Sequence, residues 1–116
     1  MTTLASEPLA SLLDRLFAAA DASEDALERE MEKIPPAERQ AMLTGTTGYI
    51  EAYTRARDFP LAVSRETAAL LYMLARSCGA RRIVEFGTSF GISTLHLAAA
   101  LRDNGGGHLI LSLIHI

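Results

Sequence analysis

The chain contains little of what would assign a protein to a particular class at once. Of its 116 residues, none is tryptophan and one is cysteine, Cys78. A single cysteine cannot form an internal disulfide, which favours a cytoplasmic setting over a secreted one. Because Cys78 falls late in an apolar helical pattern, we expect it to be a small buried hydrophobic residue.

Long apolar runs and an excess of one charge are also missing. No run reaches the roughly 18–20 residues of a membrane span, and Glu7, Asp14 and Arg15 interrupt any apolar core of a secretory signal. The 11 basic and 14 acidic residues leave a formal charge of -3, which argues against a nucleic-acid surface. We therefore expect neither a membrane nor nucleic acid as a partner.

What the first half of the chain does contain is helical periodicity. Apolar residues at helical spacing predict a helix over residues 4–20, and a charge-rich, helix-forming stretch predicts another over 22–33. Pro35-Pro36 ends that helix, and a short third helix is expected over 36–43. A fourth short helix is expected over 49–58.

The second half predicts a strand, a helix and a second strand. Ser64 is a candidate N-cap for an apolar helix that Gly79 would end. Residues 82–86 form the expected first strand, 91–102 the next helix, and a second strand begins at 108–110. Because a right-handed crossover helix joins the two strands, we expect them to be parallel.

Together these elements predict an α/β fold with a helical cap, residues 1–60, and the first β-α-β unit of a Rossmann-like domain, residues 61–110. Parallel sheets need both faces covered, so two strands are not stable alone. We therefore expect the chain to be the truncated N-terminal part of a larger fold. Residues 111–116, LSLIHI, match one translation of the transposon mosaic-end adapter used in sequencing libraries, and we expect them to be a non-native tail.

The most informative segment runs from Ile83 to Ser93, IVEFGTSFGIS. A short apolar strand leads into a glycine turn and a helix start, which is how an α/β domain builds a nucleotide-type cofactor site. A phosphate-binding P-loop is excluded, because Gly87 and Gly91 lie too close together and no lysine follows. A dinucleotide site prefers G-x-G-x-x-G, and Ser89 stands in place of the second glycine.

Glu85, two residues before Gly87, favours S-adenosylmethionine over a dinucleotide. Its carboxylate would face two phosphates in NAD or FAD, whereas S-adenosylmethionine has no phosphate and carries an ammonium and a sulfonium. The carboxylate of that cofactor can accept hydrogen bonds from the turn and from the helix N-terminus. Gly87 lets the chain pass close to the ligand, and Ser93 places a hydroxyl in the first helical turn.

The same residues resemble a known family. Val84–Ser93 is similar to the first motif of class I methyltransferases, and more narrowly of the catechol and caffeoyl-CoA type O-methyltransferases. Their pattern is apolar-Glu-apolar-Gly-x-x-x-Gly-x-Ser, which the chain matches at each fixed place. Val63–Leu71 also resembles the segment before the first core helix of that family. The resemblance covers residues 55–110 and implies a Rossmann-like domain that binds S-adenosylmethionine.

Carried over position by position, the resemblance implies six cofactor-binding residues: Val63, Glu85, Gly87, Thr88, Ser89 and Ser93. Val63 would contribute backbone and apolar surface near the methionyl end of the cofactor, beside Glu85. Gly87 and Thr88 would line the turn with backbone groups, and Ser93 would bind the methionyl carboxylate. Ser89 stands where relatives often carry an aromatic residue.

The resemblance implies an O-methyltransferase that moves a methyl group in line to a hydroxyl of a small molecule, with the enzyme mainly positioning the reactants. No catalytic residue and no metal ligand is assigned, because the family supplies these from downstream strands, although the intact protein could use a divalent metal. His96 is expected to be a packing or surface residue rather than a base. The family's second strand ends in an acidic residue that binds the ribose, and none follows His108 here. We therefore expect the 116-residue chain alone to be inactive.

Two other classes of function stay open. A fragment of a nicotinamide-dependent oxidoreductase would share the strand–turn–helix order, but Glu85 and the missing second glycine disfavour it. A non-enzymatic helical interaction module would depend on residues 1–60 and should not respond to S-adenosylhomocysteine. The N-terminal helices could also pack on a second copy, so a homodimer of the intact enzyme is a further expectation.

Overall fold

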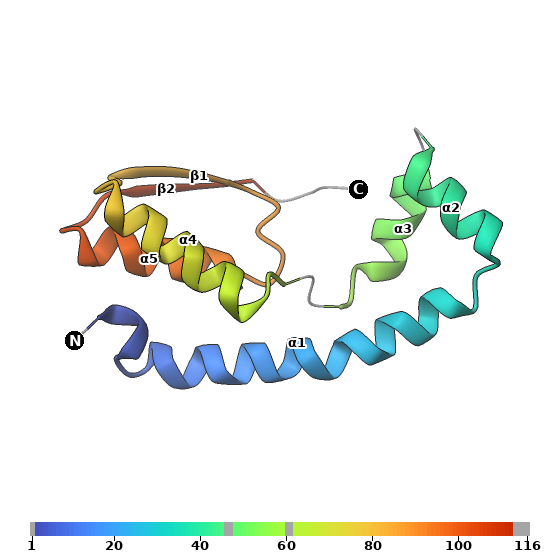
Figure 1. The fold of residues 1–116 in the computed structure, drawn as a ribbon, viewed down its shortest axis with the longest axis horizontal. Coiled ribbons are helices and arrows are strands. Elements are labelled where there is room, and N and C mark those ends of the chain that lie inside the picture. Colours follow the sequence, from blue (N-terminus) through green and yellow to red (C-terminus); the bar gives the residue numbers. More distant parts are fainter. Residues whose placement is uncertain (1, 46–47, 60–61, 113–116) are drawn as a thin grey trace. The chain divides into compact units, whose positions relative to one another are not determined.

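The computed structural model describes residues 2–45, 48–59 and 62–112, and it has a mixed α/β composition dominated by helices (Figure 1). The chain divides into two compact units. The sheet unit joins the residues up to Ala18 with the segment that starts at Ala62, and the helical unit is the segment between them. No helix among the described residues is long and apolar enough to cross a bilayer.

The first half of the chain is helical, as predicted, but its longest helix differs from the prediction. After a 3-10 turn at Thr3–Ala5, a single helix, α1, runs over Leu9–Glu32. The expected break near residue 21 is wrong, because no glycine or proline lies inside this range to interrupt the backbone hydrogen bonds. Residues 4–8 lie outside α1, since Pro8 stands directly before its first residue.

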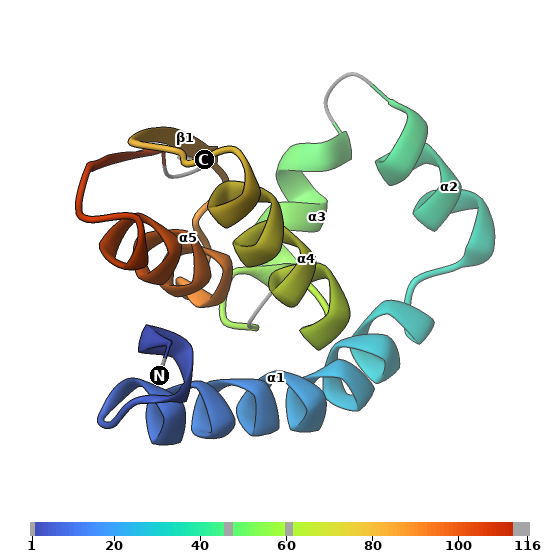
Figure 2. The same cartoon turned by 60° about the vertical axis from the view of Figure 1, so that its left-hand side comes forward.

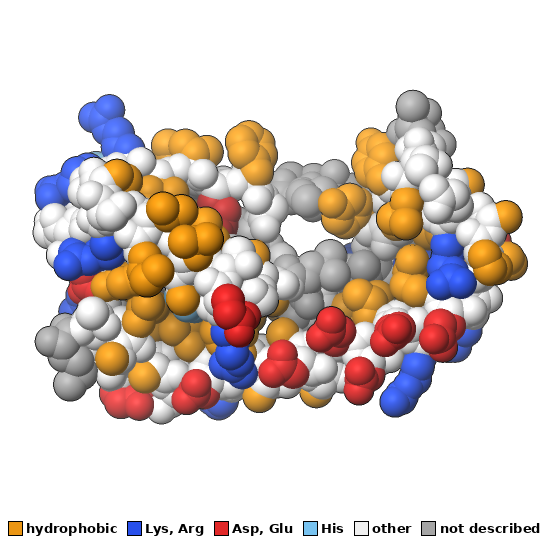
Figure 3. Space-filling model, in the orientation of Figure 1, with side chains coloured by type: hydrophobic (Ala, Val, Ile, Leu, Met, Phe, Trp, Pro, Cys, Tyr) orange, Lys and Arg blue, Asp and Glu red, His pale blue; other side chains and the backbone are white. Residues whose placement is uncertain are grey.

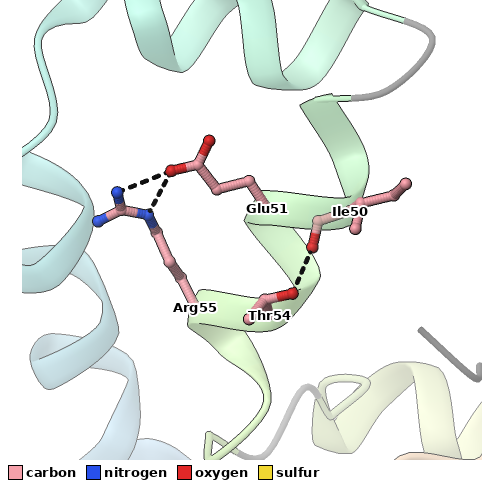
Figure 4. A network of polar contacts seen from close by, with 4 residues as sticks. All are labelled: Ile50, Glu51, Thr54 and Arg55. Carbon is pink, nitrogen blue, oxygen red and sulfur yellow. Dashed lines mark hydrogen bonds and ion pairs between the residues drawn. The ribbon is translucent and has the colours of Figure 1, made fainter.

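The helical unit holds α2, Pro36–Thr44, and α3, Gly48–Ala56, which pack against each other. Pro36 occupies the first turn of α2, as predicted. Figure 4 shows Arg55 donating to Glu51 one turn away, at 2.8 Å, and the Thr54 hydroxyl donating to the carbonyl of Ile50 at 2.7 Å. Both charged side chains are about half exposed, so water screens the pair and it adds little to stability.

An apolar cavity of about 380 Å³ lies within the helical unit. Side chains from all three helices line it. They are Leu27 and Met31 of α1, Met42 and Leu43 of α2, and Tyr49, Ala52 and Tyr53 of α3. Among the described residues no charged side chain lines the cavity, so what they offer a ligand is mainly hydrophobic contact.

The sheet unit contains α4, Arg65–Ser77, β1, Arg82–Phe86, α5, Ile92–Asp103, and β2, His108–Ser112. β1 and β2 pair in parallel, as predicted, and the register places Val84 opposite Ile110. β2 continues through Leu111 and Ser112, two residues beyond the expected strand start at 108–110. The remaining positions of the expected tail, 113–116, lie outside the described residues.

Both predicted caps of α4 are confirmed. The Ser64 hydroxyl accepts from the backbone N–H of Thr67 at 3.1 Å, which satisfies one of the free donors at the helix start. At the other end Gly79 directly follows the C-cap residue Cys78 and takes a left-handed φ of 60°, and the next residue donates back to the carbonyl of Ala75. The first cap fixes where α4 begins. The second fixes where α4 stops and hence where the chain turns into β1.

The core of the sheet unit lies between the two helices and one face of the sheet. Ala75, Leu97 and Ala100 are buried together, and Ile83 and Leu109 pack against them from the strands. Figures 1 and 2 show α4 and α5 side by side on that face. Since side chains alternate along a strand, every second residue of β1 points away from this core.

The other face of the sheet is apolar and exposed. Val84 is 60% exposed, Phe86 84% and Ile110 61%. No described segment covers these side chains, although parallel sheets are normally buried on both faces. This composition is that of strands that pack against a second layer.

The exposed side of α4 is also more apolar than a solvated helix face. Leu70, Met73 and Leu74 are about half exposed, so the buried side of this apolar helix is the one that carries Ala68 and Ala75. Figure 3 shows hydrophobic side chains gathered over α4. The prediction that Cys78 is buried is wrong, and the residue is exposed. It is the C-cap of α4 and lies just past Ser77, the last residue of the helix.

A polar contact ties the first residues of the chain to the end of α5. The backbone N–H of Thr3 donates to Asp103 at 3.1 Å, and the Thr3 hydroxyl donates to the same carboxylate. Tyr72 of α4 donates its hydroxyl to Asp103 at 2.6 Å. These donors, Thr3 first, lower the pKa of Asp103 to about 2, while burial and then the bond to Asp103 raise the pKa of Tyr72.

The Asp103 contact predicts a specific loss of stability in acid. Its folded pKa lies below the ordinary value of 3.8, so its contribution is complete above that pH and disappears as the pH falls toward 2. Asp103→Asn should lower the free energy of unfolding at neutral pH by roughly 1 kcal/mol and should remove this part of the acid dependence. Urea denaturation between pH 5 and pH 2 measures both. Asp14→Asn, on the exposed side of α1, is the matched control, and equal pH profiles for both variants would contradict the assignment.

Candidate active site

The connection between β1 and α5 is a turn built on left-handed backbone. Gly87 has a φ of 76° and Gly91 a φ of 88°, which glycine adopts without steric cost. Ser89 has a φ of 49°, an uncommon conformation for a residue with a side chain. Residues in such conformations concentrate at ligand-binding and catalytic sites. The backbone of Ser89 therefore adds to the sequence motif as an indication that this turn is functional.

Two backbone hydrogen bonds fix this turn. The N–H of Gly91 donates to the carbonyl of Thr88 at 2.9 Å and closes the turn. The N–H of Gly87 donates to the carbonyl of Ser112 at 2.9 Å, which extends the parallel ladder by one bond. The turn therefore stands at the carboxyl ends of both strands, where open α/β sheets bind their ligands.

Glu85 lies on the core side of β1, next to this turn, and is 8% exposed. Its Oε2 accepts a hydrogen bond from the Ser93 hydroxyl at 2.6 Å, and its Oε1 accepts one from the Thr94 hydroxyl. Neither hydroxyl carries a positive charge, and an ionised carboxylate has about four acceptor positions. The site thus holds a buried carboxylate that can still accept from a cationic donor.

Thr88 contributes a polar group with no partner. The residue is 9% exposed, and its Oγ1 makes no hydrogen bond within the described part of the chain. A buried hydroxyl without a partner costs roughly 1–3 kcal/mol. A ligand atom or further protein that satisfies Thr88 Oγ1 would recover this cost, so the turn is suited to a polar ligand.

The structure brings five of the six predicted site residues to one place. Gly87, Thr88 and Ser89 form the turn, and Glu85 is hydrogen-bonded to Ser93 across it. Val63 is not joined to this group by any described contact. It is half-buried and directly precedes Ser64, the N-cap of α4.

Thr94 is the site residue that sequence reasoning missed. It follows Ser93 in the first turn of α5, so the chain places two hydroxyl side chains in sequence just after a strand-end carboxylate. This pair of adjacent hydroxyl residues is the sequence feature that could have identified Thr94. It was not decisive, because serine and threonine are also common near helix starts for capping alone.

His96 is a packing residue, which is one of the two roles that the sequence allowed for it. The residue is 6% exposed, and its Nδ1 lies 2.8 Å from the carbonyl oxygen of Ile92. Since a carbonyl only accepts, this nitrogen carries the hydrogen. The ring meets Phe17 edge-on with 5.9 Å between centroids. Over the described ranges, no three His, Cys, Asp or Glu side chains are grouped so as to hold a metal ion.

Comparison with known proteins gives a partial match of one kind. No family model matches the chain, and no solved structure matches it. Over 44 residues, 38% of this chain, it is 48% identical to a protein of Mycolicibacterium smegmatis and to one of Mycolicibacterium vanbaalenii, each named "Putative O-methyltransferase". The matched segment spans about a fifth of the length of these curated relatives, 21% and 20%. Part of the chain is thus similar to proteins named as O-methyltransferases.

Proposed function

We propose that the chain is the N-terminal part of an S-adenosylmethionine-dependent O-methyltransferase with a Rossmann-like fold. The observation that carries the proposal is Glu85. Its carboxylate is buried at the end of β1, beside a left-handed glycine turn, and its two hydroxyl partners leave its charge unbalanced. The similarity to proteins named O-methyltransferases supports the same reaction class.

The residues of the turn fit the methionyl end of this cofactor. An ammonium would supply the positive charge and the donors that Glu85 still lacks. The methionyl carboxylate would accept from Ser93 and from the N-terminus of α5, which favours negative charge. A polar atom of the ligand could satisfy Thr88 Oγ1. When bound, S-adenosylmethionine would supply a methyl group activated by its sulfonium.

A nicotinamide dinucleotide fits the same turn less well. Its two phosphates would meet a buried carboxylate at Glu85, and like charges at short range in a partly desolvated site repel strongly. Ser89 also adds a side chain where the backbone would need to approach a pyrophosphate closely. Both features favour a cofactor without phosphate.

The work assigned to this part of the chain is binding and orientation. In the structure the bonds from Ser93 and Thr94 hold Glu85 in place, and the bond from Gly87 to Ser112 holds the turn against β2. A fixed cofactor brings its methyl group into line with a substrate hydroxyl, which converts a bimolecular step into an effectively unimolecular one. The acceptor we propose is a hydroxylated small molecule, bound by the full-length protein.

The first test of this function is cofactor binding. Full-length protein, expressed from the uninterrupted reading frame, should bind S-adenosylhomocysteine in titration calorimetry. Glu85→Ala should weaken that binding by about 1–3 kcal/mol, because a charged partner of the ammonium is lost. Glu28→Ala removes an exposed carboxylate of α1 and should leave the affinity unchanged. Equal affinities for the wild type and Glu85→Ala would remove Glu85 from the site.

The reaction class is tested by methyl transfer. Full-length protein should transfer a labelled methyl group from S-adenosylmethionine to at least one member of a catechol panel, assayed with and without magnesium. The 116-residue chain, assayed in parallel, should give no transfer above background. Absence of transfer to the whole panel, together with absence of S-adenosylhomocysteine binding, would contradict the proposed function.

Gly87 gives a test of the turn itself. Gly87→Val should abolish cofactor binding, since a branched side chain at a φ of 76° is strained and would occupy space beside the ligand. Helical content by circular dichroism should stay nearly unchanged. Gly79→Val is the matched control, because Gly79 also has a left-handed φ but lies outside the turn, where an added Cβ would meet no atom within 4 Å. Parental affinity in Gly87→Val would show that the turn does not touch the cofactor.

A further inference from the structure

Two hydroxyls on adjacent residues hold the Glu85 carboxylate, and they hold different oxygens. Ser93 donates to Oε2 and Thr94 to Oε1. Both residues lie in the first turn of α5, so the carboxylate is fastened to the helix that begins just beyond the glycine turn. The pair restricts rotation of the carboxylate more than either bond alone, because two oxygens are fixed at once.

The two hydroxyls cannot keep the same partners once a cofactor is present. Each hydroxyl has one proton to donate. If Ser93 donates to the methionyl carboxylate, as the proposed function requires, it no longer donates to Glu85. Of the two hydroxyls that hold Glu85, Thr94 is then the one that remains.

We propose that Thr94 is a positioning residue for the cofactor's ammonium. It keeps the Glu85 carboxylate in place while Ser93 exchanges Glu85 for the methionyl carboxylate. This inference rests on the proposed function and deepens it, since it assigns the residue that maintains Glu85 in the bound state.

Burial makes the Thr94 bond hard to replace. Glu85 is 8% exposed, so a water molecule cannot readily take the place of a missing hydroxyl. Thr94 is itself partly buried, and its branched side chain has few rotamers, which reduces the freedom of its hydroxyl. Loss of the hydroxyl should therefore loosen Glu85 even though the carboxylate remains.

The test compares two ligands that differ at the amino-acid end. S-adenosylhomocysteine carries the ammonium and carboxylate, whereas 5′-methylthioadenosine keeps the adenosine and the thioether but lacks both. In full-length protein, Thr94→Val should bind S-adenosylhomocysteine about tenfold more weakly than the wild type. Its affinity for 5′-methylthioadenosine should not change. A purely structural role for Thr94 would weaken both ligands alike.

Two further variants separate positioning from packing. Thr94→Ser keeps the hydroxyl and should restore most of the affinity for S-adenosylhomocysteine. In a Glu85→Gln background, Thr94→Val should cause little additional loss, because its effect acts through the carboxylate. If Thr94→Val reduces the yield of folded protein, Thr94→Ala gives the same comparison without the second methyl group.

The outcomes distinguish the inference from the function on which it rests. Wild-type protein that binds neither ligand contradicts the proposed function. Wild-type protein that binds S-adenosylhomocysteine, with Thr94→Val binding it equally well, overturns the role of Thr94 alone. Equal losses for both ligands, or full additivity with Glu85→Gln, also overturn it.

Discussion

The parallel hydrogen-bond ladder between β1 and β2 is the contact on which the site depends. Parallel strands need a long crossover connection, and α5 supplies it here. The N-terminus of α5 therefore lies at the carboxyl ends of both strands. The bond from Gly87 to Ser112 then fixes the turn to β2, and Glu85 comes within reach of the hydroxyls on α5.

The alternation that turns Glu85 toward α5 also exposes its neighbours. Val84 and Phe86 flank Glu85 in sequence, so they point to the opposite face, where Ile110 joins them. Together with the exposed apolar residues of α4, this face gives the sheet unit two surfaces that suit further packing. The proposal that the chain is part of a longer protein accounts for both surfaces, because further segments would pack on them. The matched segment spans about a fifth of the length of its curated relatives.

Local chemistry explains what the sequence could predict. Pro36, Ser64 and Gly79 each act through their own backbone or their nearest turn, and each marks a helix end as expected. The strand–turn–helix order around Gly87 was predictable for the same reason, because glycine and a short apolar run determine it locally. These features need no knowledge of distant parts of the chain.

The features that sequence analysis missed depend on contacts between elements or on the absence of a breaker. α1 is continuous because nothing between Leu9 and Glu32 stops it, although its charge-rich half differs from its apolar half. Which side of α4 is buried depends on α5, so periodicity alone could not show that Leu70 and Met73 are exposed. Thr94 was missed because its partner, Glu85, lies on another element.

The contact between Thr3 and Asp103 sets an order on how the sheet unit assembles. The two residues are 100 positions apart, whereas α4, β1, α5 and β2 follow one another directly along the chain. Short loops close at a lower entropic cost than long ones, so the consecutive elements can meet first. During synthesis Thr3 leaves the ribosome long before its partner Asp103 is made. Within the sheet unit, Thr3 is thus made first but can reach its native contact only after β1 and α5 have been made.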